Sequence, residues 1–411
     1  MWVETLESRT RISLVNILSI ICCLLFAYAF YRNALRIYYN FPYSYSWGEI
    51  FIKYTDAYIR RGLLGDILYR IDAVIPVRYF WTITATCIAA AFYGISYRVI
   101  SKLFDSTATL ILFFTPSYFM FLIYDPAVFG RKDFIILLAM FAICYMIYRA
   151  LTGRSSFITC LILSEVFYFI ALLTHEMAFF FVFVPFCLML CMKKSAFEQW
   201  CFILAAAVTV VLSLYLMLCF QGTPEMREQM FQQWHSRYPL FDREHMGGME
   251  FIGVAAQNWL FDAINIMTGS ISMPSFLLAF LLSILPFWVC LDRKSFPLAC
   301  KSCFGKHFYG FFFIMQALPL ITLMFIFTDY GRILSYCCII CLMSYCTIMY
   351  AYRWHNPDYK YMGPVLSLQT PLRLTIILLY LYAWRLVHCA SSWESFIEPH
   401  FYLQFFRYLT Q

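Results

Sequence analysis

Long apolar runs separated by short polar segments fill most of this chain, and no other feature constrains its fold as strongly. About 20 predominantly apolar residues are enough to cross a bilayer as an α-helix. The sequence predicts eleven such spans, at residues 12–31, 80–98, 107–125, 133–149, 157–175, 177–192, 200–219, 274–291, 309–328, 333–352 and 373–389.

Composition points to the same class. Hydrophobic residues make up 63% of the 411 residues and charged residues 13%, against roughly 45–50% and 25% in soluble domains. A soluble core of this size cannot hide so much apolar surface. We therefore predict an all-α integral membrane protein in which residues 1–411 form a single polytopic domain. The net charge of +7 fits membrane-surface and phosphate electrostatics, while the scattered basic residues indicate no nucleic-acid partner.

The first run resembles a signal-peptide core, because it follows Arg9 and Arg11, but no small-residue cleavage site comes after it. We expect it to remain as the first helix. The placement of lysine and arginine in short loops puts the N-terminus and the loop 353–372 in the cytoplasm. Two long external loops result, at 32–79 and 220–272.

Four short charged clusters interrupt the chain at the ends of apolar runs, and the predicted topology places them all on the external side. Charged groups are costly near the bilayer core, so converging clusters indicate a functional site. The clusters are Asp56–Gly62, Gly130–Asp133, His175-Glu176 and Asp329–Arg332.

The first external loop carries apolar residues at helical spacing from Trp47 to Ile71, which predicts one or two amphipathic helices on the membrane surface, bent or separated near Gly62 and Gly65. Asp56 and Arg60 are four residues apart within it. This spacing fits either an exposed salt bridge or a carboxylate beside a phosphate-binding pair, Arg60-Arg61. Asp66 and Arg70 repeat the spacing, and here an exposed pair is favoured.

The second cluster stands at the start of a predicted helix. Asp133 in the first turn is favourable against the helix dipole, and Arg131 and Lys132 beside free backbone amides make an anion-binding cradle. An ordinary polar turn with snorkelling basic side chains is the alternative.

The third and fourth clusters each leave two interpretations. His175-Glu176 interrupts a nearly continuous apolar stretch; Phe179 stands where a zinc protease needs its second histidine, so the pair is either a site or a structural hydrogen bond. Asp329 and Arg332 join two apolar runs around Gly331, which permits a tight turn.

Metal and disulfide signals are weak. The 17 cysteines lie almost entirely inside apolar runs, so no disulfide framework is predicted. Cys300 and Cys303, with His307 nearby, supply half of a zinc-ribbon spacing and no second pair. We predict no bound cofactor; a requirement for a divalent metal is left open. The loop 220–272 combines aromatic, amide and charged residues, which suits carbohydrate or an ordinary loop.

The layout resembles the GT-C class of membrane glycosyltransferases: a first helix, a long external loop with surface helices and an acid, then many spans. The four clusters are similar to patterns in polysaccharide-cluster membrane proteins of bacteria. The resemblance implies a polyprenyl-phosphate- or diphosphate-linked sugar donor, a lipid-linked or polymeric glycan acceptor, and a bacterial inner membrane with the site facing the exterior.

The resemblance also implies residue roles. Asp56 would be the catalytic base, with Glu49 and Asp66 as rivals, because Thr55 precedes Asp56 where many GT-C enzymes have a second acid. His175 and Glu176 would orient the acceptor or share the proton transfer. The remaining cluster residues would bind substrate and phosphate; they are Arg60, Arg61, Arg131, Lys132, Asp133, Asp329 and Arg332.

Two other functions remain open. A lipid-linked oligosaccharide flippase or other transporter is expected to place charges at mid-membrane in paired halves, whereas here the clusters stand at the ends of runs. A membrane acyltransferase using His175 is the second alternative.

Overall fold

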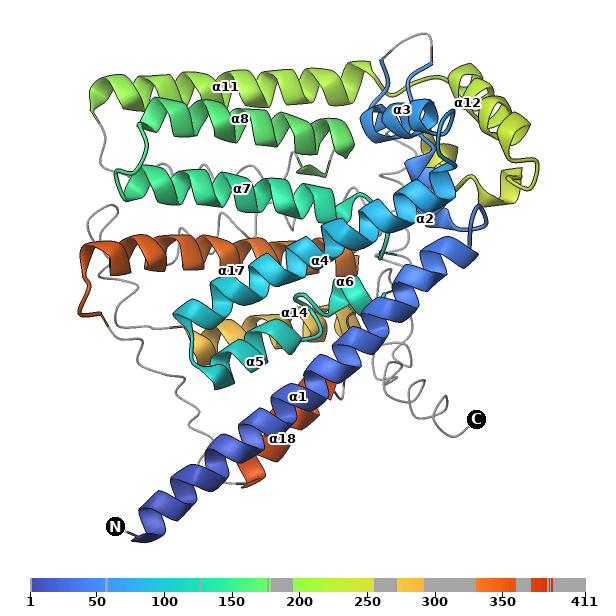
Figure 1. The fold of residues 1–411 in the computed structure, drawn as a ribbon. Helices are drawn as coiled ribbons and strands as arrows, with labels where there is room; N and C mark the ends of the chain where they lie inside the picture. The colour runs from blue at the N-terminus through green and yellow to red at the C-terminus, as the bar shows by residue number, and fades with distance from the viewer. Residues whose placement is uncertain are drawn as a thin grey trace, which may run out of the picture.

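The computed structural model describes residues 2–55, 58–125, 128–175, 177–178, 195–254, 272–291, 330–359 and 371–382, together with 384 and 386. Within these ranges every regular element is a helix (Figure 1).

Five of the described helices are long and apolar enough to cross a membrane, which indicates a membrane protein. They are α1 (Trp2–Tyr39, apolar from Asn16), α4 (Val77–Leu103), α7 (Asp133–Leu151), α8 (Phe157–Thr174) and α17 (Tyr330–His355). Shorter apolar stretches lie in α11 (Ala196–Cys219) and α14 (Ser272–Cys290). The predicted span 309–328 falls outside the described residues, as does 177–192 from residue 179 onward and the end of 373–389 beyond α18 (Pro371–Tyr382).

The prediction of one continuous span at 107–125 is wrong. The chain forms α5 (Ser106–Phe114) and the short α6 (Phe121–Tyr124), separated by non-helical backbone. Thr115 is extended because Pro116 follows it, and a residue before proline is disfavoured in the helical region. The break is held inside the protein, since the Tyr118 hydroxyl donates to Ser283 O at 3.0 Å and Ser335 Oγ donates to Tyr118 O at 3.1 Å. Irregular backbone among spans is tolerated where protein buries it.

Polar side chains fix where the apolar helices begin. Ser156 caps α8 by accepting from Thr159 N, and Ser195 caps α11 in a reciprocal box with Glu198. Helices α7, α8 and α11 lie side by side, with α17 against α7 (Figure 1). Of the five spans, α17 is the most buried and α1 the least, so α17 is central and α1 peripheral.

The connection that was predicted as an external loop at 32–79 is shorter in the structure, because α1 extends to Tyr39 and α4 begins at Val77. The predicted amphipathic stretch is two helices, α2 (Tyr45–Ile50) and α3 (Gly62–Ile71), with residues 51–61 between them. Gly62 starts the second helix.

The two segments predicted as external loops pack together into one unit, which we call the cap and define as residues 40–55, 58–76 and 220–254. Its second part contains α12 (Pro224–Arg237) and the 3₁₀ helices η1 (Arg243–His245) and η2 (Gly247–Phe251). The Trp234 ring stacks on Phe51 at 4.2 Å between centroids, and its Nε1 donates to Phe51 O at 2.8 Å. Arg237 donates to Tyr69 O at 2.8 Å. Trp234 is fully buried in this contact, so its ring cannot serve a carbohydrate surface.

Close backbone approach in the cap makes Gly48 a specific test of this packing. A Cβ added at Gly48 would stand 2.0 Å from the carbonyl oxygen of Met246, so Gly48→Ala must push η2 away from α2. We expect the substitution to lower the free energy of unfolding by about 1–3 kcal/mol, measured by thermal unfolding in lipid nanodiscs. Gly94→Ala is the control, because nothing lies within 4 Å of its added Cβ and alanine favours helix. Equal stability of the two variants would contradict this packing.

Candidate functional site

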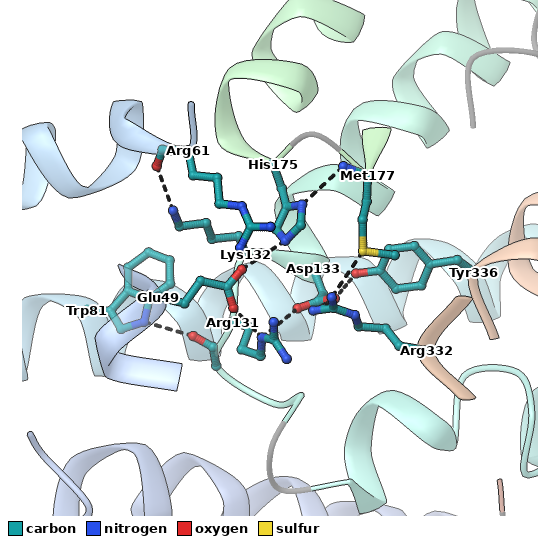
Figure 2. A network of polar contacts seen from close by, with 11 residues as sticks. Glu49, Arg61, Trp81, Arg131, Lys132, Asp133, His175, Met177, Arg332 and Tyr336 are labelled. Carbon is teal, nitrogen blue, oxygen red and sulfur yellow. Dashed lines mark hydrogen bonds and ion pairs between the residues drawn. The ribbon is translucent and has the colours of Figure 1, made fainter. Parts of the chain in front are cut away.

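Seven charged or titratable side chains from distant parts of the sequence meet where the cap joins the spans (Figure 2). They come from α2, the turn before α7, the start of α7, the end of α8, the start of α17 and the residue before α3. Each is at most 7% exposed. We call this group the charge cluster; its members are Glu49, Arg61, Arg131, Lys132, Asp133, His175 and Arg332.

Glu49 stands at the centre of the charge cluster and is completely buried. One carboxylate oxygen accepts from Arg131 Nε, and the other lies 3.1 Å from His175 Nε2. Burial alone would raise the pKa of Glu49, but Arg131, His175 and Arg332 together hold it well below its usual range. The side chain is therefore an ionised, firmly paired carboxylate and a weak proton acceptor. The sequence pattern indicated Glu49 only as an alternative to Asp56 for the role of catalytic base.

His175 is held by contacts on both ring nitrogens. Its Nδ1 accepts from the backbone N–H of Met177 at 3.1 Å, so the ring proton of the neutral form is on Nε2, facing Glu49. Its own backbone N–H closes α8 by donating to Ala171 O at 2.9 Å. This geometry suits a residue that positions Glu49 rather than one that takes a proton from a substrate.

Asp133 links α7 to α17. One of its oxygens accepts from the Tyr336 hydroxyl, and Arg332 Nη1 lies 3.6 Å from the same oxygen. The other oxygen is 3.8 Å from Arg131 Nε. Arg332 and Tyr336 are four residues apart on α17, so they share the face that meets Asp133. Asp133 therefore holds two arginines in place, and its position in the first turn of α7 is favourable to the helix dipole.

Lys132 connects the first segment of the cap to α7. Its buried ammonium donates to the backbone carbonyl of Arg61 at 2.8 Å. Arg61 adopts a left-handed conformation, with φ of 66°, immediately before α3. Arg60 is half-buried, and its backbone N–H donates to Phe220 O at 3.1 Å.

Three of the predicted site residues, Asp56, Glu176 and Asp329, lie outside the described residues. Glu176 directly follows His175 of the charge cluster in the sequence. Asp66 is described, and it forms an ion pair with Arg70 at 2.9 Å on α3, where the Arg70 side chain is 80% exposed. This is the surface pair that the spacing favoured.

The charge cluster suits binding of an anion. The N-termini of α7 and α17 both meet there, and helix N-termini favour negative charge. Arginine donors match phosphate with paired hydrogen bonds. Across the described ranges no group of three or more His, Cys, Asp or Glu side chains could hold a metal ion; Cys300, Cys303 and His307 lie outside them.

The opposite end of the bundle gives a test of sidedness. There Arg353 donates to Lys102 O at 3.1 Å and Arg154 lies 4.0 Å from the Trp354 ring, so the far ends of α4, α7 and α17 meet. We expect cysteines at exposed Arg70 and Arg243 to react with a membrane-impermeant maleimide in intact cells, above the wild-type background.

Cysteines at exposed Arg154 and Asn356 are the matched controls, and they should react only after the membrane is opened. Labelling of both pairs from one side would contradict a bundle that spans the bilayer.

No protein-family model, no curated protein and no solved structure matches this chain. The function is therefore inferred from the chemistry of the charge cluster and from its position at the junction of spans and cap.

Proposed function

We propose that the protein is a membrane glycosyltransferase of the GT-C type, which takes a sugar from a polyprenyl-phosphate- or diphosphate-linked donor to build or modify a surface polysaccharide. The observation that carries the proposal is the burial of four cations at helix ends, where the cap meets the spans. They are Arg61, Arg131, Lys132 and Arg332.

A lipid-linked phosphate fits this position. Its polyprenyl tail stays among the lipid chains, and its phosphate lies at the boundary where the spans end. Cations and helix N-termini placed there stabilise the negative charge that develops as the phosphate leaves the sugar. Asp133 fixes Arg131 and Arg332 in advance, so little rearrangement is needed when the phosphate binds.

Transfer also needs a base, and the described acids narrow the choice. Glu49 is locked between Arg131 and His175 with a lowered pKa, and Asp66 is paired with Arg70 on the surface. Asp56 therefore stays our proposed base. It would take the proton of the acceptor hydroxyl as the oxygen bonds to the anomeric carbon, while the bond to phosphate breaks on the opposite face with inversion.

The two alternatives have less support. The described charge cluster stands at helix ends, whereas a flippase is expected to hold its charges at mid-membrane. Glu165 in α8 is an acid within a span, but it accepts from Thr209 Oγ1 at 2.5 Å and joins α8 to α11. An acyltransferase using His175 needs a ring nitrogen turned to substrate, and both nitrogens face protein groups.

A gel of surface polysaccharide from a deletion strain tests the proposal. Loss of the polymer ladder would identify a polymerase, and an altered epitope on an intact ladder would identify a branch-adding transferase. Precursor trapped on the cytoplasmic side would instead identify a flippase, and unchanged sugars with lost acyl groups an acyltransferase; either result overturns the proposal.

A further inference from the structure

A pocket of about 170 Å³, lined by both polar and apolar side chains, lies beside the charge cluster. It is bounded by the last turns of α1, the start of α2 and the turn before α7. Its polar side chains are Asn33, Arg36, Asn40, Ser44 and Ser46. We propose that this pocket binds one neutral pyranose ring of the glycan substrate, next to the arginines that hold phosphate. The inference rests on the proposed function and adds to it a binding site for the sugar.

The lining suits a sugar ring better than a bare ion. A pyranose has hydroxyl groups at its edge and C–H groups on its faces. Asn40 offers an amide that both donates and accepts, as hydroxyl groups require. Asn33 donates from its amide nitrogen to Ile123 O, which holds its side chain in the pocket wall. Tyr45, which is 42% exposed, offers an aromatic ring to the C–H face. A few polar groups among apolar and aromatic ones is the usual make-up of small-molecule sites.

The walls of the pocket are fixed in advance by hydrogen bonds. Trp47 Nε1 donates to Ile37 O at 3.1 Å, which joins α2 to α1. Trp81 Nε1 donates to Gly130 O at 3.0 Å, which joins the turn before α7 to α4. Gly130 has φ of +91°, and a Cβ there would stand 2.7 Å from Ile37, so glycine allows the close approach of α1. Preorganised walls reduce the entropy lost when a ligand binds.

Two contacts connect the pocket to the charge cluster. The Arg131 guanidinium lies 5.1 Å from the centre of the Tyr45 ring, and Arg131 directly follows Gly130 in the wall. Trp47 and Ile50, on either side of Glu49 in α2, also line the pocket. A ring held here therefore lies against Tyr45 and Gly130, beside the part of the chain that carries Arg131. Donor and acceptor sugars share this ring chemistry.

Binding can be measured without transfer. We would record saturation-transfer NMR on the full chain in phospholipid nanodiscs free of alkyl-glycoside detergent, with a mixture of methyl glucoside, galactoside, mannoside and N-acetylglucosaminide. At least one pyranoside should receive saturation from the wild-type protein. Asn40→Leu and Arg36→Leu should each abolish it, while Asn356→Leu, an exposed asparagine at the opposite end, should retain it.

Thermal unfolding of each variant identifies any variant that fails to fold. If one of the two pocket variants fails, the saturation measured with the other one tests the pocket. Absence of saturation in wild type, or equal saturation in wild type and a folded pocket variant, would overturn the pocket.

The two proposals fail separately. Asp56→Asn should retain pyranoside saturation, so saturation in a protein with no transferase activity supports the pocket and counts against the transferase. Transferase activity in a protein that shows no pyranoside saturation supports the transferase and counts against the pocket. A transfer assay identifies which sugar the pocket holds. Asn40→Leu should raise the KM for the donor if the donor ring binds there, and the KM for the acceptor if the acceptor ring does. An unchanged KM for both substrates contradicts the inference.

Discussion

Glu49→Gln is expected to destabilise the protein strongly, although it only replaces one carboxylate oxygen with an amide nitrogen and removes the negative charge. Glu49 has no exposed surface, and its carboxylate is the direct partner of Arg131 and His175. Breaking this buried ion pair leaves Arg131 with only the more distant carboxylate of Asp133, 3.8 Å away, and the loss of a buried partner costs about 3–5 kcal/mol. We expect a loss of that size in the free energy of unfolding, measured by denaturant titration in nanodiscs, with a matching fall in abundance.

Asp66→Asn is the matched control, because it removes an acid from the same segment of the cap, and the partner of that acid, Arg70, is 80% exposed. Surface pairs contribute about 0–1 kcal/mol, so this variant should stay close to wild type. The double variant Glu49→Gln, Arg131→Gln should lose less stability than the two single changes added together, since neither charge is then left alone. A Glu49→Gln effect as small as that of Asp66→Asn would show that the pair contributes little.

Asp56→Asn is expected to have the opposite profile, with a large loss of activity and normal stability. The amide keeps the size of the carboxylate but cannot take a proton. Transfer should fall by at least ~10²-fold, the usual contribution of a general base, measured with a labelled lipid-linked sugar donor. Asp66→Asn again serves as the control and should retain transfer. Turnover near wild type in Asp56→Asn would move the search for the base to Glu176 and Asp329.

The sequence located several elements well, for physical reasons. The predicted spans 133–149 and 157–175 correspond to α7 (Asp133–Leu151) and α8 (Phe157–Thr174), where polar residues stand at both ends of an apolar run. The prediction of a continuous span at 107–125 was wrong because the mean hydropathy of a window does not register Pro116, which changes the backbone conformation and not the apolar character of the run. The start of α4 was placed three residues late for a related reason, since its first turn contains Arg78.

The candidate site was only partly predictable. The position of Arg131, Lys132, His175 and Arg332 at the ends of apolar runs indicated a site, because a charged group is costly to bury near a bilayer unless it has a partner or a function. The central role of Glu49 was missed, because its ion pair with Arg131 joins positions 82 residues apart and α2 is too short to show an amphipathic pattern. The bond from Lys132 to Arg61 O, across 71 residues, is equally invisible in sequence.

Binding of polyprenyl phosphate, compared with the polyprenol of the same chain length, tests most directly whether the charge cluster holds a lipid-linked phosphate. Native mass spectrometry of the purified chain can measure both, in wild type and in Arg332→Ala and Arg332→Lys. Polyprenyl phosphate should bind wild type more tightly than the alcohol. Arg332→Ala should weaken phosphate binding roughly ten- to a hundredfold, as the loss of a charged hydrogen bond predicts, and should leave alcohol binding unchanged. Arg332→Lys should recover part of the loss, because ammonium lacks the forked geometry of guanidinium. Equal binding of the phosphate and the alcohol by wild type would contradict a phosphate site in the charge cluster.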